Sequence, residues 1–335
     1  MTQETSKMLH ELPPTPHAKT GWPWTEASAP LPAKMSDGSP WPKISIVTPS
    51  FNQTQFLEET IRSVLLQNYP NLEYIIIDGG STDGSMEIIK KYEPWLTYWV
   101  SEPDRGQSQA VNKGIRLATG DLLLWLNADD LCLPSAFSTV AQTLIDHPQT
   151  KLVVGQAQLI DENSNVIGEL RSSFSTWDEV AVKASNQIRQ VSSFFKRDLF
   201  DELGFLNENL QIAMDAELLL RFTKRYNPTI IDEYLTAFRL HKSSKSQKYR
   251  LLARKETDFF IPNLLKSKKL KSQYKKNSAR KWLMLPRSSD QNTFLNIYCL
   301  VRAVINDYKL TKTKEYWLEI SKTFTKKSSK RNNNE

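Results

Sequence analysis

From residue 43 onward, short apolar runs alternate with stretches in which apolar residues recur at helical spacing. Residues 56–65 and 86–90 carry the clearest helical stripes, and Asp83 stands where a helix N-cap is expected. Alternation of strands and helices is typical of a mostly parallel sheet flanked by helices, so we expect an α/β domain. Its predicted strands are residues 44–48, 74–78, 98–101, 121–126 and 152–156.

The pattern changes after residue 156. A turn is expected at residues 161–165, then a polar helix, a strand at 191–195 and a strongly apolar helix at 213–222. We expect this half of the domain to hold an acceptor.

Charge and glycine content divide the chain near residue 242. From His241 to the end there are 24 Lys and Arg against 7 Asp and Glu, whereas residues 1–240 have 20 against 30. All 11 glycines lie at or before Gly204, so the C-terminal part lacks the tight turns of an α/β domain. We predict a flexible leader (1–42), a catalytic domain (43–242) and a basic helical extension (243–335).

Several features favour a cytoplasmic protein. The first 42 residues are rich in Pro, Ser and Thr and lack the apolar core of a signal peptide. No apolar run approaches the ~20 residues of a membrane helix. Cys132 and Cys299 are far apart and suggest neither a disulfide framework nor a zinc site.

Ligands of an open α/β sheet bind beyond the carboxyl ends of its strands, so the residues after each apolar run are the most informative. A dinucleotide enzyme needs Gly-x-Gly-x-x-Gly after its first strand, but Pro49 and Phe51 stand there, and a Walker loop is also absent. Rossmann oxidoreductases and P-loop enzymes are therefore disfavoured. The segments that follow the strands are TPSFN (48–52), DGGSTDG (78–84), EPDRGQ (102–107) and NADD (127–130).

Asp129 and Asp130 directly follow a buried strand, where two carboxylates repel each other unless a cation compensates them. Mg²⁺ and Mn²⁺ prefer oxygen ligands and bind one or two carboxylates together with substrate phosphates. This pair is a candidate metal site. The alternative is that Asp130 caps a turn or the helix that begins near Pro134.

Seven segments, in this order and spacing, resemble glycosyltransferase family 2, which has the GT-A fold. The resemblance covers about residues 43–242. The segments are ISIVTPSFN (44–52), EYIIIDGGSTDG (73–84), SEPDRGQ (101–107), NKGI (112–115), ATGD (118–121), LNADD (126–130) and MDAELLLR (214–221).

The resemblance implies transfer of a sugar from a nucleotide diphosphate-sugar, with a UDP-sugar as the expected donor and Mn²⁺ or Mg²⁺ as the metal. It implies that Pro49, Phe51 and Asp78 hold the base and ribose. Arg105 and Asn112 would line the donor pocket. Asp129 would bind the metal with Asp130 beside it. The other donor-site positions are Asn52, Gly79, Gln107 and Asn127.

The sequence departs from the family at two points. The family often has Asp-Asp where this chain has Asp78-Gly79, and Asp-x-Asp where this chain has Asn127-Ala128-Asp129. The first departure leaves open which base is bound. The second removes one charged oxygen, so we expect modest metal affinity.

Asp215 is the candidate catalytic base, because an attacking hydroxyl must lose a proton and Asp215 matches the family's base. Its position also suits a helix N-terminal cap. Glu217 is expected to support it or to contact the acceptor. A single base without a carboxylate nucleophile on the donor side predicts inversion at the anomeric carbon.

The sequence allows two interpretations for Arg105 and two for His241. Arg105 carries a guanidinium that matches phosphate, or it pairs with Asp104 at the surface. In many relatives a histidine at the place of His241 approaches the diphosphate or metal, and imidazole suits both. The alternative for His241 is an ordinary surface histidine.

The basic extension contains aromatic and apolar residues among its lysines. It could contact an anionic membrane surface, which would suit a lipid-linked acceptor, or pack on the catalytic domain. The resemblance to the family implies a surface polysaccharide or a lipid-linked glycan as the acceptor. Nothing indicates nucleic-acid binding. The residues in question are Trp282, Leu283, Met284, Phe294, Tyr298, Val301, Ile305, Trp317 and Phe324.

Two competing functions stay open on the sequence alone. A sugar nucleotidyltransferase shares the layout but needs a Gly-rich, basic loop after the first strand, where Pro49, Ser50 and Phe51 stand. A catalytically inactive nucleotide-sugar-binding or regulatory protein would keep the same scaffold.

Overall fold

The computed structural model describes residues 7–16, 18–183, 187–283 and 293–313, together with residues 316 and 318. The chain divides into two compact units. Unit 1 contains Met1–Phe174 and Asn186–Ser244, and unit 2 contains Ser175–Ser185 and Lys245–Glu335. The division after Ser244 lies close to the expected boundary near residue 242. The short segment that follows Phe174 also belongs to unit 2, which the sequence did not indicate.

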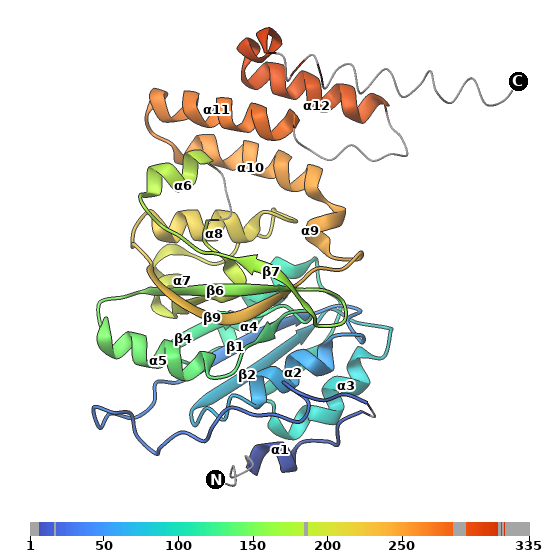
Figure 1. Cartoon of the computed structure of the whole chain (residues 1–335), viewed down its shortest axis with the longest axis vertical. Helices are drawn as coiled ribbons and strands as arrows, with labels where there is room; N and C mark the ends of the chain where they lie inside the picture. Colours follow the sequence, from blue (N-terminus) through green and yellow to red (C-terminus); the bar gives the residue numbers. More distant parts are fainter. Residues whose placement is uncertain are drawn as a thin grey trace, which may run out of the picture. The chain divides into compact units, whose positions relative to one another are not determined.

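Unit 1 is built on a mixed sheet (Figure 1). In the described residues it has nine strands in the order β3-β2-β1-β4-β8-β6-β9-β5, with β7 paired to β6. Strands β1 to β4 run parallel, whereas β8 is antiparallel to β4 and β6. The strands are β1 Ile44–Ser50, β2 Leu72–Asp78, β3 Tyr98–Ser101, β4 Leu122–Trp125, β5 Leu131–Cys132, β6 Leu152–Ile160, β7 Val166–Leu170, β8 Ser193–Lys196 and β9 Thr229–Arg239.

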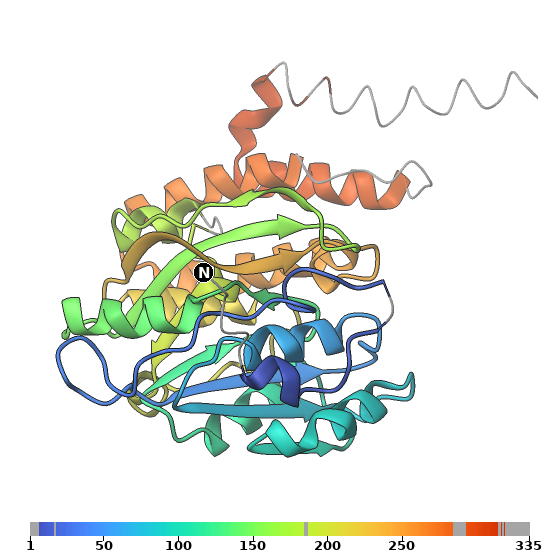
Figure 2. The same cartoon turned by 60° about the horizontal axis from the view of Figure 1, so that its bottom comes forward.

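Helices flank this sheet, as Figures 1 and 2 show. Strands β1 and β4 are buried along their whole length, which explains their continuous apolar runs. Helix α4 lies close to β1 because Gly114 has no side chain; a Cβ there would collide with Val47. The helices of unit 1 are α1 Lys7–Glu11, α2 Leu57–Leu65, α3 Ser85–Tyr92, α4 Gln107–Leu117, α5 Ala136–Asp146, α7 Asp198–Leu203 and α8 Met214–Thr223, with 3-10 turns η1 Glu93–Trp95 and η2 Gln190–Ser192.

The parallel register brings the strand ends level. Ser50 at the end of β1 lies opposite Asp78 at the end of β2, and Asp78 lies opposite Ser101 at the end of β3. In β4, Trp125 lies opposite Val47 of β1, so its polar continuation emerges at the same edge. The predicted α/β fold and the gathering of polar segments at one edge are thereby confirmed.

Two strands have other bounds in the structure than the sequence predicted. Strand β6 continues to Ile160, and β8 begins only at Ser193 because residues 190–192 form a 3-10 turn. The predicted turn is present, with Asp161 N donating to Asn165 O at 2.9 Å, and it leads into β7. Strands β7 and β9 were missed, because neither presents a regular apolar alternation.

The N-terminal segment was expected to be a flexible leader, but its described residues pack on unit 1. Figures 1 and 2 show this segment, in dark blue, running beside α2. The buried Arg62 guanidinium on α2 donates to the carbonyls of Pro13 (3.0 Å), Pro23 (3.0 Å) and Trp24 (2.9 Å). These partners are distant from Arg62 in the sequence, so the composition of the N-terminal segment could not indicate that it packs against α2. The segment also contributes Leu12, Met35 and Trp41 to the core.

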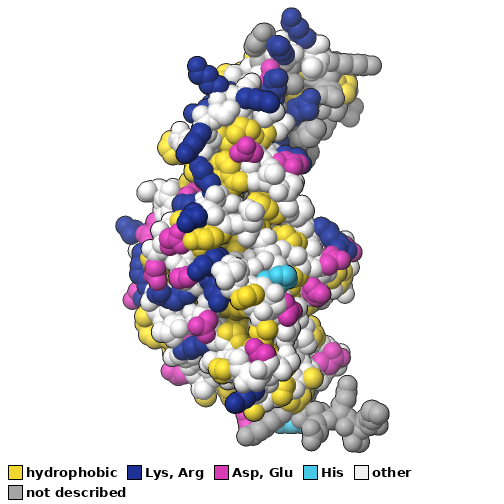
Figure 3. All heavy atoms as spheres, turned by 90° about the vertical axis from the view of Figure 1, so that its left-hand side faces the viewer, with side chains coloured by type: hydrophobic (Ala, Val, Ile, Leu, Met, Phe, Trp, Pro, Cys, Tyr) yellow, Lys and Arg dark blue, Asp and Glu magenta, His cyan; other side chains and the backbone are white. Residues whose placement is uncertain are grey.

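Unit 2 is helical, as predicted for the extension. Asp258 lies at its centre and accepts hydrogen bonds from Tyr274 (2.7 Å), Ser278 (2.7 Å) and Trp282 (2.6 Å), and pairs with Arg254 at 2.8 Å. Figure 3 shows Lys and Arg side chains gathered over this unit. Its helices are α6 Trp177–Lys183, α9 Lys245–Lys248, α10 Arg250–Leu264, α11 Lys268–Leu283 and α12 Thr293–Asn306, followed by η3 Tyr308–Lys312.

Apolar side chains of unit 2 are partly exposed on α12, where Tyr298, Val301 and Ile305 face outward. Trp282 and Leu283 are instead buried within the unit. The side chains of Met284, Phe294, Trp317 and Phe324 lie outside the described residues. Among the described helices, none has the length and apolar character to span a membrane.

We expect Arg62→Ala to destabilise unit 1 by about 3 kcal/mol, because it leaves buried carbonyls of the N-terminal segment without their donors. Urea denaturation measures this change, and limited proteolysis should cut the segment near residues 13–24 more readily. Arg171→Ala, at an exposed arginine, is the control and should change neither. Unchanged stability of the Arg62 variant would contradict the packing described here.

Candidate active site

Asp78 shapes the loop that follows β2. Its carboxylate is fully buried and accepts hydrogen bonds from the backbone of Gly80 (3.1 Å) and Ser81 (2.8 Å) and from the hydroxyls of Ser81 (2.6 Å) and Ser101 (2.7 Å). Its oxygens are thus engaged by the protein. A direct contact with base or ribose, as the sequence suggested, would have to displace one of these bonds.

Gly79 lies close to residues of the loops that follow β1 and β3. A Cβ on Gly79 would lie 2.7 Å from Asp104 Oδ2 and 3.3 Å from Phe51 Cδ2. Phe51 is 59% exposed, although its neighbour Pro49 is buried in β1. An exposed aromatic ring beside a bare backbone and a carboxylate is suited to a flat, hydrogen-bonding ligand such as a nucleobase.

Asn52 joins the loops that follow β1 and β2. It adopts a left-handed conformation (φ 52°), its amide N donates to Ser81 Oγ (2.7 Å) and its Oδ1 accepts from Thr82 N (2.9 Å). Asparagine tolerates this conformation better than most residues. Asn52 therefore fixes these two loops relative to each other.

Arg105 and Asn112 meet the loop that precedes α8. The exposed Arg105 guanidinium pairs with Glu208 at 3.0 Å, and not with Asp104 as the alternative interpretation held. Asn112 is buried and binds the backbone of Leu206 through both ends of its amide, at 2.9 Å each, and Glu208 Oε1 at 3.0 Å. Asn112 was expected to line the donor pocket, but its amide is used to hold the loop from 205 to 213.

Asn127 connects three segments at the end of β4. Its Oδ1 accepts from Gln107 Nε2 (2.7 Å) and Trp125 Nε1 (2.9 Å), and its Nδ2 donates to Asp130 Oδ2 (3.0 Å). Gln107 is the first residue of α4, so this contact holds the helix N-terminus against the Asp129 segment. Both predicted donor-site residues therefore lie at the same edge of the sheet.

Asp130 is turned into the protein. It is fully buried, and its other oxygen, Oδ1, accepts from Arg239 N at 2.9 Å. Burial raises the pKa of Asp130 well above its ordinary value, and the neighbouring Asp129 carboxylate raises it further. The expectation that Asp130 binds metal is corrected on this geometry, because both of its oxygens are held by internal donors.

Asp129 and His241 face each other across the site. His241 Nε2 lies 2.9 Å from Asp129 Oδ2, and His241 Nδ1 lies 2.8 Å from Ser243 Oγ. The histidine side chain is 4% exposed and the aspartate side chain 21%. The Phe56 ring packs against the imidazole with centroids 4.7 Å apart. His241 is thus a buried site residue, and the surface alternative is wrong.

The Asp129–His241 pair offers two ligands to a cation. In the described part of the chain, no group of three or more His, Cys, Asp or Glu side chains converges on one point. Mg²⁺ and Mn²⁺ commonly use one or two protein ligands and take the rest from water and substrate phosphates. The residues present therefore fit a metal that binds together with a diphosphate.

Two sets of contacts tie the start of α8 to this edge. Ser108, next to Gln107, donates to Leu210 O at 3.4 Å. Helix α8 also contacts η2, where Gln190 donates to Trp125 O at 2.6 Å. These contacts connect the segment before α8 with α4, and α8 with the turn that binds the end of β4.

Asp215 and Glu217 differ in their surroundings. Asp215 Oδ1 accepts from Ala216 N at 2.7 Å. Glu217 forms a two-pronged ion pair with Arg221, with both N···O distances 2.9 Å, and Arg221 also donates to the carbonyls of residues 203–205. Glu217 was expected to support the base or contact the acceptor, but its carboxylate anchors the loop before α8.

Comparison with known proteins assigns the chain to a family. Residues 45–204 match the family model described as Glycosyl transferase family 2. An uncharacterised glycosyltransferase of Mycobacterium tuberculosis is 32% identical over 201 residues, which cover 59% of this chain and 75% of that protein. The chain belongs to glycosyltransferase family 2. Another family member, a PGL/p-HBAD biosynthesis glycosyltransferase of Mycobacterium bovis, is 28% identical over 198 residues, or 58% of this chain and 74% of that protein.

Solved structures agree with the family 2 assignment at the level of fold. Residues 1–349 of S. aureus TarS superpose with a TM-score of 0.56 at 15% identity, covering 79% of this chain and 80% of that chain. The TarS complex with UDP-GlcNAc gives a TM-score of 0.53 at 14% identity, covering 83% and 91%. The GT-A fold predicted from the sequence is confirmed.

The family 2 match ends at Gly204. It includes the segments that carry Phe51, Asp78 and Asp129, but Asp215 and His241 lie beyond it. Their chemical roles, like those of all the residues above, remain predictions that depend on the contacts described here.

We expect Glu217→Ala to lower the free energy of unfolding by about 2 kcal/mol, because Arg221 keeps its charge and loses both charge-assisted hydrogen bonds. Urea denaturation measures the loss. Glu233→Ala, at an exposed position of β9, is the matched control and should have little effect. Equal stability of the two variants would contradict the anchoring role of the Glu217 carboxylate.

Proposed function

We propose that the chain transfers a sugar from a nucleoside diphosphate-sugar to an acceptor hydroxyl, with inversion at the anomeric carbon. The observation that carries this proposal is the pairing of Asp129 with His241 at a distance of 2.9 Å. The pair lies at the edge of the sheet where strands β1, β2 and β3 end. Membership of glycosyltransferase family 2 supports the reaction class.

Asp129 and His241 would hold a divalent cation, Mn²⁺ or Mg²⁺, together with the diphosphate. When bound, the cation supplies positive charge to the leaving diphosphate without a proton transfer. The protein orients His241 before the donor arrives: Ser243 contacts one imidazole nitrogen and Phe56 packs on the ring. Such a fixed arrangement reduces the reorganisation needed during the reaction.

The donor nucleoside would bind beside Gly79, at the exposed Phe51 ring. The Phe51 ring would pack against the base, while Asp104 provides a hydrogen-bond acceptor on the other side of Gly79. The Asp104 carboxylate also receives a bond from Gly106 N at 2.7 Å, which fixes its position. A UDP-sugar is the proposed donor, and the TarS complex with UDP-GlcNAc shows that the same fold accommodates one elsewhere.

Asp215 would accept the proton of the attacking hydroxyl. Its half-buried carboxylate lies in the first turn of α8 and would act as the general base. Direct attack with a single base inverts the configuration of the anomeric carbon. The acceptor would be a glycan or lipid-linked glycan, and the basic unit 2 would help to bring the enzyme to an anionic cytoplasmic membrane face.

We expect Asp129→Ala to weaken UDP binding in the presence of Mn²⁺ by 10-fold or more, because one of the two metal ligands is lost. Titration calorimetry with UDP, in Mn²⁺ and then in EDTA, measures the metal-dependent part. Asp146→Ala, on the exposed surface of α5, should bind as the wild type does. Metal-dependent binding that survives in Asp129→Ala would exclude this metal site.

We expect Asp215→Asn to slow sugar transfer by 10²-fold or more, since the usual contribution of a general base is lost, and to leave donor binding intact. A donor panel with Mn²⁺, followed by NMR of the product, measures both the rate and the configuration of the new bond. Asp198→Asn, also in a helical first turn, is the control. A retained configuration would exclude direct displacement, and donor binding without any turnover in the wild type would favour an inactive binding protein.

A further inference from the structure

Arg239 is a buried cation at the last residue of β9, two positions before His241. Its side chain is 0% exposed, and Glu59 on α2, its ionic partner, is 7% exposed. A buried charge is costly unless it is paired and fully hydrogen-bonded, so the set of groups around Arg239 must be precisely arranged. Arg239 has no direct part in the proposed sugar transfer.

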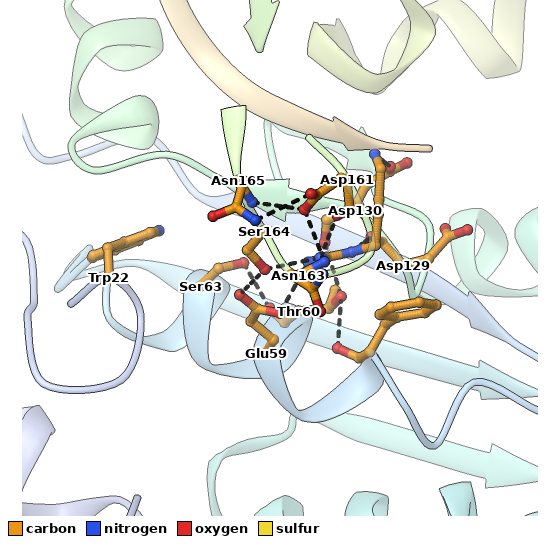
Figure 4. Close-up of polar contacts among 12 residues, drawn as sticks. Trp22, Glu59, Thr60, Ser63, Asp129, Asp130, Asp161, Asn163, Ser164 and Asn165 are labelled. Atoms are coloured by element: carbon orange, nitrogen blue, oxygen red, sulfur yellow. Dashed lines mark hydrogen bonds and ion pairs between the residues drawn. The ribbon is translucent and has the colours of Figure 1, made fainter. Parts of the chain in front are cut away.

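The guanidinium distributes its N–H donors over three separate segments. Nε donates to Asp129 O (2.8 Å), Nη1 to Asp161 O (3.1 Å) and Ser164 Oγ (2.8 Å), and Nη2 to Glu59 Oε2 (2.9 Å). Ser164 also donates to Glu59 Oε1 at 2.7 Å, which closes a ring of contacts. Figure 4 shows Glu59 and Ser164, which come from different elements, close to each other and to the turn at Asp161.

The same arginine contacts the Asp129–Asp130 segment and lies two residues before His241. Its side chain holds the carbonyl of Asp129, and its backbone N donates to Asp130, which keeps the segment in place. Its main chain leads within two residues to His241. The Phe56 ring lies 4.8 Å from the Arg239 guanidinium and 4.7 Å from the imidazole, so one ring packs against both.

The turn between β6 and β7 is the third member of this arrangement. Asp161 closes it by accepting from the backbone of Asn163 (2.9 Å) and Asn165 (2.9 Å), which leaves its main-chain carbonyl directed at Arg239. The turn lies outside the strand ends that carry the proposed donor site. It is joined to the Arg239–His241 segment by the guanidinium and by Leu240 N, which donates to Ile160 O at 2.8 Å.

We infer that Arg239 is a positioning residue that sets the spacing of Asp129 and His241, with Glu59 and the turn at Asp161–Asn165 as its support. This inference rests on the proposed function, since it concerns the affinity for the cation that the pair would hold. A planar guanidinium is required because four acceptors lie in different directions, and the single ammonium of lysine cannot reach them all.

The test compares Mn²⁺ binding among three variants of the full chain. Mn²⁺ affinity in the presence of UDP is measured by titration calorimetry and by the Mn²⁺ EPR signal, and stability by urea denaturation. We expect Arg239→Lys to weaken Mn²⁺ binding 10-fold or more, and Ser164→Ala, which removes one acceptor and one donor far from the cation, to weaken it two- to fivefold. UDP binding in EDTA should be unchanged in both.

Arg254→Lys is the matched control, because Arg254 is also a buried arginine paired with a carboxylate, Asp258 in unit 2, at 2.8 Å. It should lose stability and keep the wild-type Mn²⁺ affinity. Wild-type Mn²⁺ affinity in Arg239→Lys, or an equal loss in Arg254→Lys, would overturn the inference. If Arg239→Lys does not fold, Ser164→Ala decides in the same way.

Failure of this inference can be told apart from failure of the proposed function. If the wild type binds Mn²⁺ and UDP together but the Arg239 and Ser164 variants bind them equally well, only the positioning role is wrong. If the wild type binds no Mn²⁺ with UDP, the metal-dependent proposal and the positioning role fall together.

Discussion

Antiparallel pairing of β5 with β9 is the constraint on which the candidate site depends. The register sets Leu131 opposite Ala237, so the chain that enters β5 and the chain that leaves β9 meet, and Asp129 and His241 come together although they are 112 positions apart. A strand of two residues cannot hold such a register alone. Thr60 on α2 supports it by bonding to carbonyls of the loop before β5, at 2.8 and 2.9 Å. The site is therefore a consequence of long-range pairing and of the helix beneath it.

Helix α2 supports the candidate site through more buried polar contacts than its amphipathic sequence pattern indicates. An amphipathic stretch usually turns its polar side to water, yet Glu59, Arg62 and Ser63 are all buried. Arg62 holds the N-terminal segment, Ser63 accepts from the backbone of Cys132 at 3.1 Å, and Glu59 balances the charge of Arg239. One short helix thus connects the segment before the first strand with the loop that presents Asp129. Because buried polar groups must be satisfied, each of these contacts restricts where the neighbouring segment can lie.

The fold and the place of the site could be predicted from the sequence, because they depend on local signals. Continuous apolar runs predicted the buried parallel strands. The polar residues directly after these runs predicted the edge of the sheet at which Asp129 lies. The direction of individual side chains could not be predicted in the same way. Asp130 and Asn112 match family motifs, but both face internal donors and acceptors supplied by residues about a hundred positions away. Arg239 had no signal at all, since a single arginine at the end of a strand is usually exposed.

The presence of asparagine at position 127 follows from the same geometry. Asn127 Nδ2 donates to Asp130 Oδ2 at 3.0 Å, while its Oδ1 accepts from Trp125 and Gln107. An aspartate there would set a second carboxylate oxygen at this distance from the buried Asp130, and like charges so close strongly oppose each other. With asparagine, the amide satisfies Asp130 and leaves Asp129 as the carboxylate that points outward. The departure from Asp-x-Asp thus keeps a second negative charge out of the interior and leaves Asp129 and His241 as the candidate metal ligands.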